Sequence, residues 1–66
     1  MKNTIKVERA IMSLTQEDLS KKVSVSRQTI NAMEANKYVP STVLALKIAR
    51  VFNKYVEEIF MLEETD

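Results

Sequence analysis

Residues 14–40, LTQEDLSKKVSVSRQTINAMEANKYVP, contain two short segments of helical periodicity separated by only a few residues. Leu19 and Val23 lie four residues apart in the first segment, as the apolar positions of an amphipathic helix do. Thr15 precedes this pair, and Asp18 follows Thr15 by three residues, which is the spacing of a reciprocal capping pair. A helix is therefore predicted to begin directly after Thr15.

The second segment begins after a tight turn that ends at Ser26, whose hydroxyl can cap a helix N-terminus. Ile30 and Met33 supply the next apolar spacing, so a second helix is predicted from about residue 27. On a helical wheel one side holds Ser26, Ile30 and Met33, with Glu34 at its border. The other side holds Arg27, Gln28, Asn31, Ala32 and Ala35. The first side is predicted to face a core and the second to be exposed.

Helices are also expected on both sides of this pair. A first helix is predicted from about Asn3 or Thr4 to Met12, with core candidates Ile5, Ala10 and Ile11. Ser41 is predicted to cap a helix over residues 42–52, whose apolar face consists of Leu44, Ala45, Ile48, Ala49 and Phe52. Residues 56–62, VEEIFML, fit either a short fifth helix or a helix followed by an extended tail.

The chain contains no glycine, although four of its predicted helices must end in a turn. Ser13, Ser24, Asn36 and Asn53 stand where the chain leaves a helix. Asparagine tolerates left-handed backbone geometry better than most residues, so Asn36 and Asn53 are predicted C-terminal caps. Serine tolerates it less well, and a positive φ at Ser24 would cost on the order of 1 kcal/mol relative to glycine.

Composition excludes several classes of function. Without cysteine or histidine the chain has no disulfide, no thiolate or imidazole metal site, and no cysteine or histidine catalysis. Glu34 is a lone carboxylate beside a helical core, which is a poor active site, so we expect neither an enzyme nor a metal or cofactor. No apolar run approaches the roughly 18 residues of a membrane span. The N-terminus lacks the apolar core of a signal peptide, so a cytoplasmic protein is expected.

Charge is distributed unevenly along the chain. Residues 21–54 carry seven lysines and arginines against one acid, whereas residues 56–66 carry five acids and no base. A basic middle and an acidic tail suggest a surface that faces a polyanion and a separate solvated end. Arg9 and Glu34 both fall close to predicted core positions, where a charge needs a partner, so a structural ion pair between them is predicted.

The exposed side of the second helix carries side chains suited to reading DNA. Arginine pairs with guanine O6 and N7, and glutamine or asparagine pairs with adenine N6 and N7. Arg27, Gln28 and Asn31 are therefore candidate base readers. An arginine in the first turn opposes the helix dipole, which indicates a partner outside the helix. The plainer alternative is an ordinary solvated helix surface, which any amphipathic helix shows.

Groups that could contact phosphates flank this helix. The candidates are Thr15, Gln16, Ser26, Thr29, Lys37 and Tyr38. The free backbone amides at a helix N-terminus also bind phosphate. Capping alone is an equally good interpretation of Gln16 and Ser26, and packing against Val39 or Pro40 is the simpler interpretation of the Tyr38 ring.

At these residues the chain resembles the Xre-type family of small helix-turn-helix repressors, which includes the phage repressors and Cro proteins. The matching segments are LTQEDL, VSRQTINAMEANKYVPS, LALKIARVF and VEEIF, and the likeness extends from Ile5 to Phe60. It implies an all-α, compact, five-helix domain like that of lambda repressor over residues 1–66. The helix-turn-helix unit would cover about 15–36, and the third helix would enter the major groove of double-stranded DNA.

The resemblance also implies roles for individual residues. The position of Gln16 typically holds a phosphate, Arg27 and Gln28 read bases, and Asn31 lies within reach of bases or backbone. Lys37 and Tyr38 would approach phosphates, and Arg9 and Glu34 match an interior ion pair of the family. Small members usually bind as twofold dimers, often through the tail, here about 55–66. The apolar contacts of such a dimer would come from Tyr55, Val56, Ile59, Phe60 and Leu62.

The chain departs from the family pattern mainly at the turns. Ser20 and Ser24 stand where alanine and glycine are common, Asn36 where glycine is common, and Thr42 where leucine is usual. An extended tail that pairs with residues 2–4, as in some short members, stays open. The expected function is a sequence-specific transcriptional regulator, a repressor that binds a palindromic operator as a homodimer. The alternatives are a protein-interaction module or an antitoxin component with the same fold, and no small-molecule ligand is evident.

Overall fold

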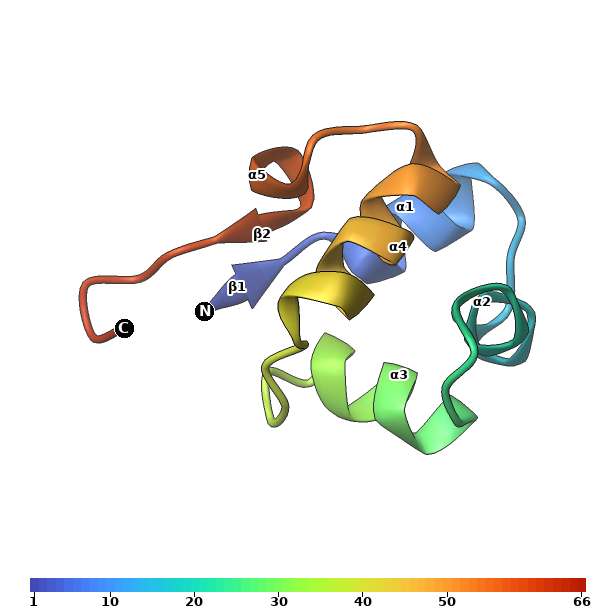
Figure 1. Ribbon diagram of the computed structural model, residues 1–66, viewed down its shortest axis with the longest axis horizontal. Helices are drawn as coiled ribbons and strands as arrows, with labels where there is room; N and C mark the ends of the chain where they lie inside the picture. Colours follow the sequence, from blue (N-terminus) through green and yellow to red (C-terminus); the bar gives the residue numbers. More distant parts are fainter.

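The computed structural model describes residues 1–66 and contains five helices and one two-stranded antiparallel sheet (Figure 1). In chain order the elements are β1 (Lys2–Asn3), α1 (Ile5–Ile11), α2 (Gln16–Val23), α3 (Arg27–Glu34), α4 (Thr42–Phe52), α5 (Val56–Ile59) and β2 (Phe60–Met61). The predicted helical fold is confirmed. None of the helices combines the length and the apolarity that crossing a membrane requires.

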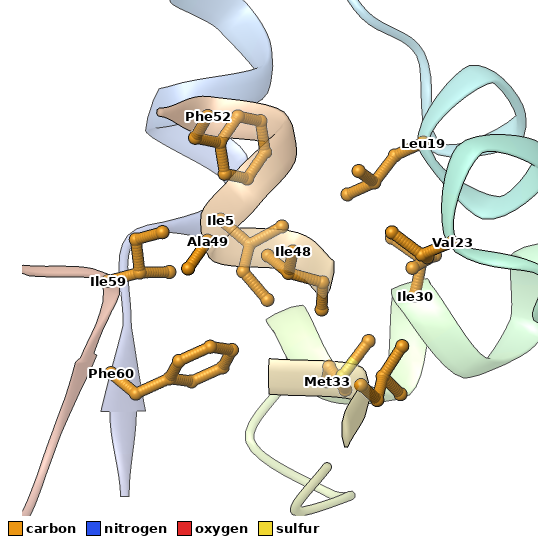
Figure 2. Close-up of a cluster of buried hydrophobic side chains, with 11 residues drawn as sticks. Ile5, Leu19, Val23, Ile30, Met33, Ile48, Ala49, Phe52, Ile59 and Phe60 are labelled. Atoms are coloured by element: carbon orange, nitrogen blue, oxygen red, sulfur yellow. The ribbon is translucent and has the colours of Figure 1, made fainter. Parts of the chain in front are cut away.

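The core is formed by one cluster of apolar side chains to which every helix contributes (Figure 2). Its members are Ile5, Leu19, Val23, Ile30, Met33, Leu44, Ile48, Ala49, Phe52, Ile59 and Phe60. Ile5 and Ile48 are completely buried, and in Figure 2 they lie between the side chains of α2 and α3 on one side and Ile59 and Phe60 on the other. The apolar face predicted for residues 42–52 is present, with Ala45 at its half-buried border.

Helix α1 is rotated relative to the prediction. Ile5 is buried as expected, but Ala10 is exposed and Ile11 is 69% exposed, so the prediction that both lie in the core was wrong. The face that turns inward follows Ile5 with Glu8 and Arg9, at the three- and four-residue spacing of one helix side. Glu8 is only 7% exposed, and its carboxylate accepts a hydrogen bond from Lys54 Nζ at 2.7 Å. Because two inward positions are charged, apolar periodicity pointed to the wrong side of this helix.

The four turns without glycine all adopt left-handed geometry. Ser13, Ser24, Asn36 and Asn53 have φ values of 55°, 60°, 60° and 54°. After each of them, the next backbone N–H donates to the carbonyl five residues earlier, at 2.9–3.1 Å. These are the hydrogen bonds of the Schellman motif, which satisfy carbonyls that a helix end leaves free. The predicted capping geometry of Asn36 and Asn53 is confirmed, and both serines also hold a conformation that favours glycine.

The tail after α5 is extended, which decides between the two alternatives left open for residues 56–62. Strand β2 pairs antiparallel with β1, with Lys2 opposite Met61 and Asn3 opposite Phe60. The two ends of the chain are therefore held side by side, at the left of Figure 1.

Candidate nucleic-acid interface

Helices α2 and α3 pack against each other through buried apolar residues, and α3 forms the lower edge of the molecule in Figure 1. The Thr15 side chain accepts from the Asp18 N–H at 2.9 Å, and Asp18 Oδ2 accepts from the Thr15 N–H at 3.0 Å. This backbone hydrogen bond from Thr15 lowers the pKa of Asp18. Ser20 is buried where alanine is common, but its hydroxyl donates to the Glu17 carbonyl at 2.7 Å. The extra hydroxyl is therefore satisfied within α2.

Helix α3, which we call the reading helix, presents a polar face to solvent. Ile30 and Met33 are buried, whereas Arg27, Gln28 and Asn31 are exposed. Ser26 caps the helix, because its Oγ accepts from the Thr29 N–H at 3.2 Å and also lies 3.0 Å from Thr29 Oγ1. Both hydroxyls thus have a partner within the protein.

An ion pair beneath the reading helix joins it to α1. Arg9 Nε lies 2.6 Å from Glu34 Oε2, and Arg9 Nη2 donates to Glu34 Oε1 at 2.9 Å. Arg9 Nη1 also donates to the Leu14 carbonyl at 2.9 Å. Burial by itself would raise the pKa of Glu34, but hydrogen bonds from Arg9 and Gln16 outweigh burial and lower it. Glu34 is therefore an ionised carboxylate that receives hydrogen bonds and donates none.

Gln16, the first residue of α2, reaches across to the reading helix. Its Nε2 donates to Glu34 Oε1 at 3.2 Å and to Asn31 Oδ1 at 3.3 Å. The amide nitrogen of Gln16 is thus directed toward the protein. This contact could not be read from the sequence, because it depends on the angle between two helices rather than on a spacing along one.

The far end of the reading helix is held by β1. Asn3 Nδ2 donates to the Met33 carbonyl at 2.8 Å and to Asn36 Oδ1 at 3.2 Å. Lys37 and Tyr38 follow in an exposed segment, and neither side chain makes a hydrogen bond within the protein. Sequence reasoning missed the role of Asn3, and the only local signal was an amide two residues before the start of α1.

The five residues expected at a dimer interface differ in burial and fall into three groups. Ile59 and Phe60 are 0% and 7% exposed and already belong to the core of one protomer. Tyr55 and Leu62 are 75% and 83% exposed. Val56 is half-buried at the edge of an apolar hollow of about 380 Å³, which is also lined by Leu46, Val39 and Phe60 among others.

Helices α2 and α3 are both capped and are joined by a tight turn in which Ser24 has left-handed backbone geometry. Together with the exposed polar face of α3, they define a helix-turn-helix protein. The chain belongs to the helix-turn-helix family, whose pattern matches residues 5–59. This family consists of DNA-binding regulators rather than enzymes.

Several relatives match along nearly their whole length. An uncharacterized HTH-type transcriptional regulator of Methanocaldococcus jannaschii is 54% identical over 66 residues, which is 100% of both chains. A regulator of the same description from Archaeoglobus fulgidus is 50% identical over all of this chain and 93% of its own. The uncharacterized HTH-type transcriptional regulator YgzD of Bacillus subtilis is 48% identical over 97% of each chain.

Proposed function

We propose that the protein is a cytoplasmic transcriptional repressor that binds a specific sequence of double-stranded DNA through the major groove. The observation that carries this proposal is the exposure of Arg27, Gln28 and Asn31 on one face of α3, opposite the buried Ile30 and Met33. No acidic side chain of this face pairs with Arg27, so its guanidinium is available to guanine O6 and N7. Family membership supports the same function.

Phosphate contacts would set the position of the reading helix in the groove. Lys37 and Tyr38 lie just beyond its C-terminal end and are free of other partners, so both can approach one phosphate strand. At the other end, the backbone N–H groups at the start of α2 are suited to phosphate, together with the Thr15 hydroxyl. The side chain of Gln16 contributes little there while its amide nitrogen faces Glu34 and Asn31.

A twofold dimer would place two reading helices about 34 Å apart on a palindromic operator. Ile59 and Phe60 are used within the protomer, so contact with a second copy falls to Tyr55, Leu62 and the half-buried Val56. Val56 adjoins Leu46, which is 56% exposed beside the apolar hollow. This surface offers an apolar contact that continues from the tail onto α4.

The dimer is tested by sedimentation of Leu46→Glu, with Val7→Glu as the matched control. Val7 is 57% exposed and lies on α1, away from the hollow. Dissociation of the Leu46 variant alone supports this interface. A monomeric wild-type protein, both free and on DNA, would refute the dimer.

Sequence-specific binding is tested by selecting bound sequences from random duplex DNA. We expect a palindromic consensus, and we expect Arg27→Ala or Gln28→Ala to cost about 1 to 3 kcal/mol of binding and to relax preference at particular bases. Lys37→Ala should instead weaken all sequences alike and reduce the salt slope by about one unit. If all three variants weakened every DNA equally, the base readers would be assigned wrongly. Absence of any enriched sequence would refute the function.

A further inference from the structure

A chain of hydrogen bonds runs from the interior ion pair through Gln16 to Asn31 on the surface of the reading helix. Each donor in it fixes which atom of the next side chain must accept. Arg9 has only donors, and the ionised Glu34 carboxylate has only acceptors. The amide of Gln16, 3.2 Å from Glu34 Oε1, must therefore turn its NH₂ group toward the carboxylate and its carbonyl away. The orientation of Gln16, which is ambiguous for an isolated amide, is decided by the charge beside it.

The same reasoning extends to Asn31. Gln16 Nε2 lies 3.3 Å from Asn31 Oδ1, within reach of its second N–H. Of the two ends of the Asn31 amide, only the carbonyl oxygen can accept this N–H, so Oδ1 faces Gln16 and the NH₂ group faces solvent. Asn31 is exposed, and its Nδ2 has no hydrogen-bond partner within the protein.

We infer that Arg9, Glu34 and Gln16 act as positioning residues that hold Asn31 as a hydrogen-bond donor toward DNA. A free asparagine can offer either its NH₂ group or its carbonyl to a base. Asn31 held by Gln16 offers only its NH₂ group, so it should prefer a base that presents hydrogen-bond acceptors in the major groove.

Base selectivity at the Asn31 position follows from the major-groove edges. Guanine presents two acceptors, N7 and O6, whereas cytosine presents only the N4 donor. The base that faces Asn31 is therefore expected to be guanine rather than cytosine, by about 10-fold in affinity. This inference rests on the proposed function, because it assigns the specificity of the same DNA-reading surface.

The first measurement is made on the free protein and does not depend on DNA. In ¹⁵N spectra, the side-chain NH₂ group of Gln16 should exchange with water several-fold more slowly than that of Gln28, which is an exposed glutamine without a partner. The NH₂ group of Asn31 should exchange as fast as that of Gln28. A protected Asn31 NH₂ group beside a rapidly exchanging Gln16 would overturn the inference.

The second measurement compares base preferences among variants selected on random duplex DNA. Asn31→Ala identifies the base pair that Asn31 contacts. Gln16→Met leaves the Asn31 amide free to turn, so the ratio of guanine to cytosine there should fall to within about twofold. Glu17→Gln, one residue away and outside the hydrogen-bond chain, is the control that should keep the wild-type ratio.

The outcomes separate the two proposals. A wild-type protein that enriches no sequence refutes the proposed function, and the exchange rates still decide the orientation of Asn31. A wild-type consensus whose base at the Asn31 position is unchanged in Gln16→Met overturns the positioning role alone.

Discussion

Removal of Arg9 alone is expected to cost the protein much of its stability. In the wild-type protein the side chains of Arg9 and Glu34 are 14% and 8% exposed and share two hydrogen bonds. Arg9→Met leaves the Glu34 carboxylate buried without its cation, and loss of one partner from a buried pair costs about 3 to 5 kcal/mol. Because the pair is partly accessible, we expect the lower end, about 3 kcal/mol. A domain of this size has only about 3 to 10 kcal/mol in total.

Urea unfolding followed by circular dichroism measures this loss, and the double variant Arg9→Met/Glu34→Leu is its control. Replacing both partners by apolar groups removes the uncompensated charge, so most of the loss should be recovered. About 1 kcal/mol should remain, since the Leu14 carbonyl still lacks the hydrogen bond from Arg9. A single-variant loss below about 1 kcal/mol would show that the pair behaves like an exposed one, and the reasoning would fail.

The pH dependence of the single variant gives a second check. Without Arg9, the burial that raises the pKa of the Glu34 carboxyl is opposed only by Gln16 and Lys6, so the folded variant should bind a proton at Glu34 more readily than the wild-type protein does. The deficit of Arg9→Met relative to wild type should therefore shrink as pH is lowered from 7 toward 4. A deficit that is constant or larger at low pH would contradict a buried, uncompensated carboxylate.

Three further predictions concern the turns, the β1 contact and acid stability. Ser24→Gly should raise the melting temperature by about 3 °C, because glycine adopts the left-handed φ of 60° without steric strain. This gain is reduced by the greater chain entropy that a glycine loses on folding. An unchanged melting temperature in Ser24→Gly would mean that the turn is unstrained. Ser26→Ala should lower the melting temperature, because it removes the N-terminal cap of α3. Asn3→Ala should speed amide hydrogen exchange at the C-terminal end of α3, whereas Lys2→Ala should not, and equal rates in both would refute the anchoring role. In the wild-type protein the pKa of Glu34 is lowered on folding, so its stabilisation is present above about pH 4.3 and is lost as pH falls through the folded pKa. The free energy of unfolding should therefore fall less on acidification in Arg9→Met/Glu34→Leu than in the wild-type protein. An equal fall in both proteins would contradict this.

Features set by neighbouring residues could be predicted from the sequence. Thr15 and Ser26 were recognisable as caps because a cap depends on a side chain and a backbone N–H three residues apart. The helix ends at Asn36 and Asn53 were recognisable because few residues other than glycine accept left-handed geometry.

Features that depend on distant segments could not be predicted in the same way. The predicted rotation of α1 was wrong because Glu8 faces inward, where its charge is paired with that of Lys54, 46 residues away. The contact of Gln16 with Asn31 depends on the angle between α2 and α3. The contact of Asn3 with Met33 joins residues 30 positions apart, and Asn3 itself lies in a strand that pairs with the other end of the chain. The base and phosphate roles of individual side chains stay predictions.

The pairing of β1 with β2 makes one end of the reading helix depend on both ends of the chain. Asn3 belongs to β1 and also holds the Met33 carbonyl at the end of the reading helix. A chain shortened before residue 60 would lose the partner strand of β1, and with it the pairing that places Asn3 beside the Met33 carbonyl. Tags or truncations at either end of the chain are therefore expected to loosen the C-terminal end of α3, although both termini lie far from that helix in the sequence.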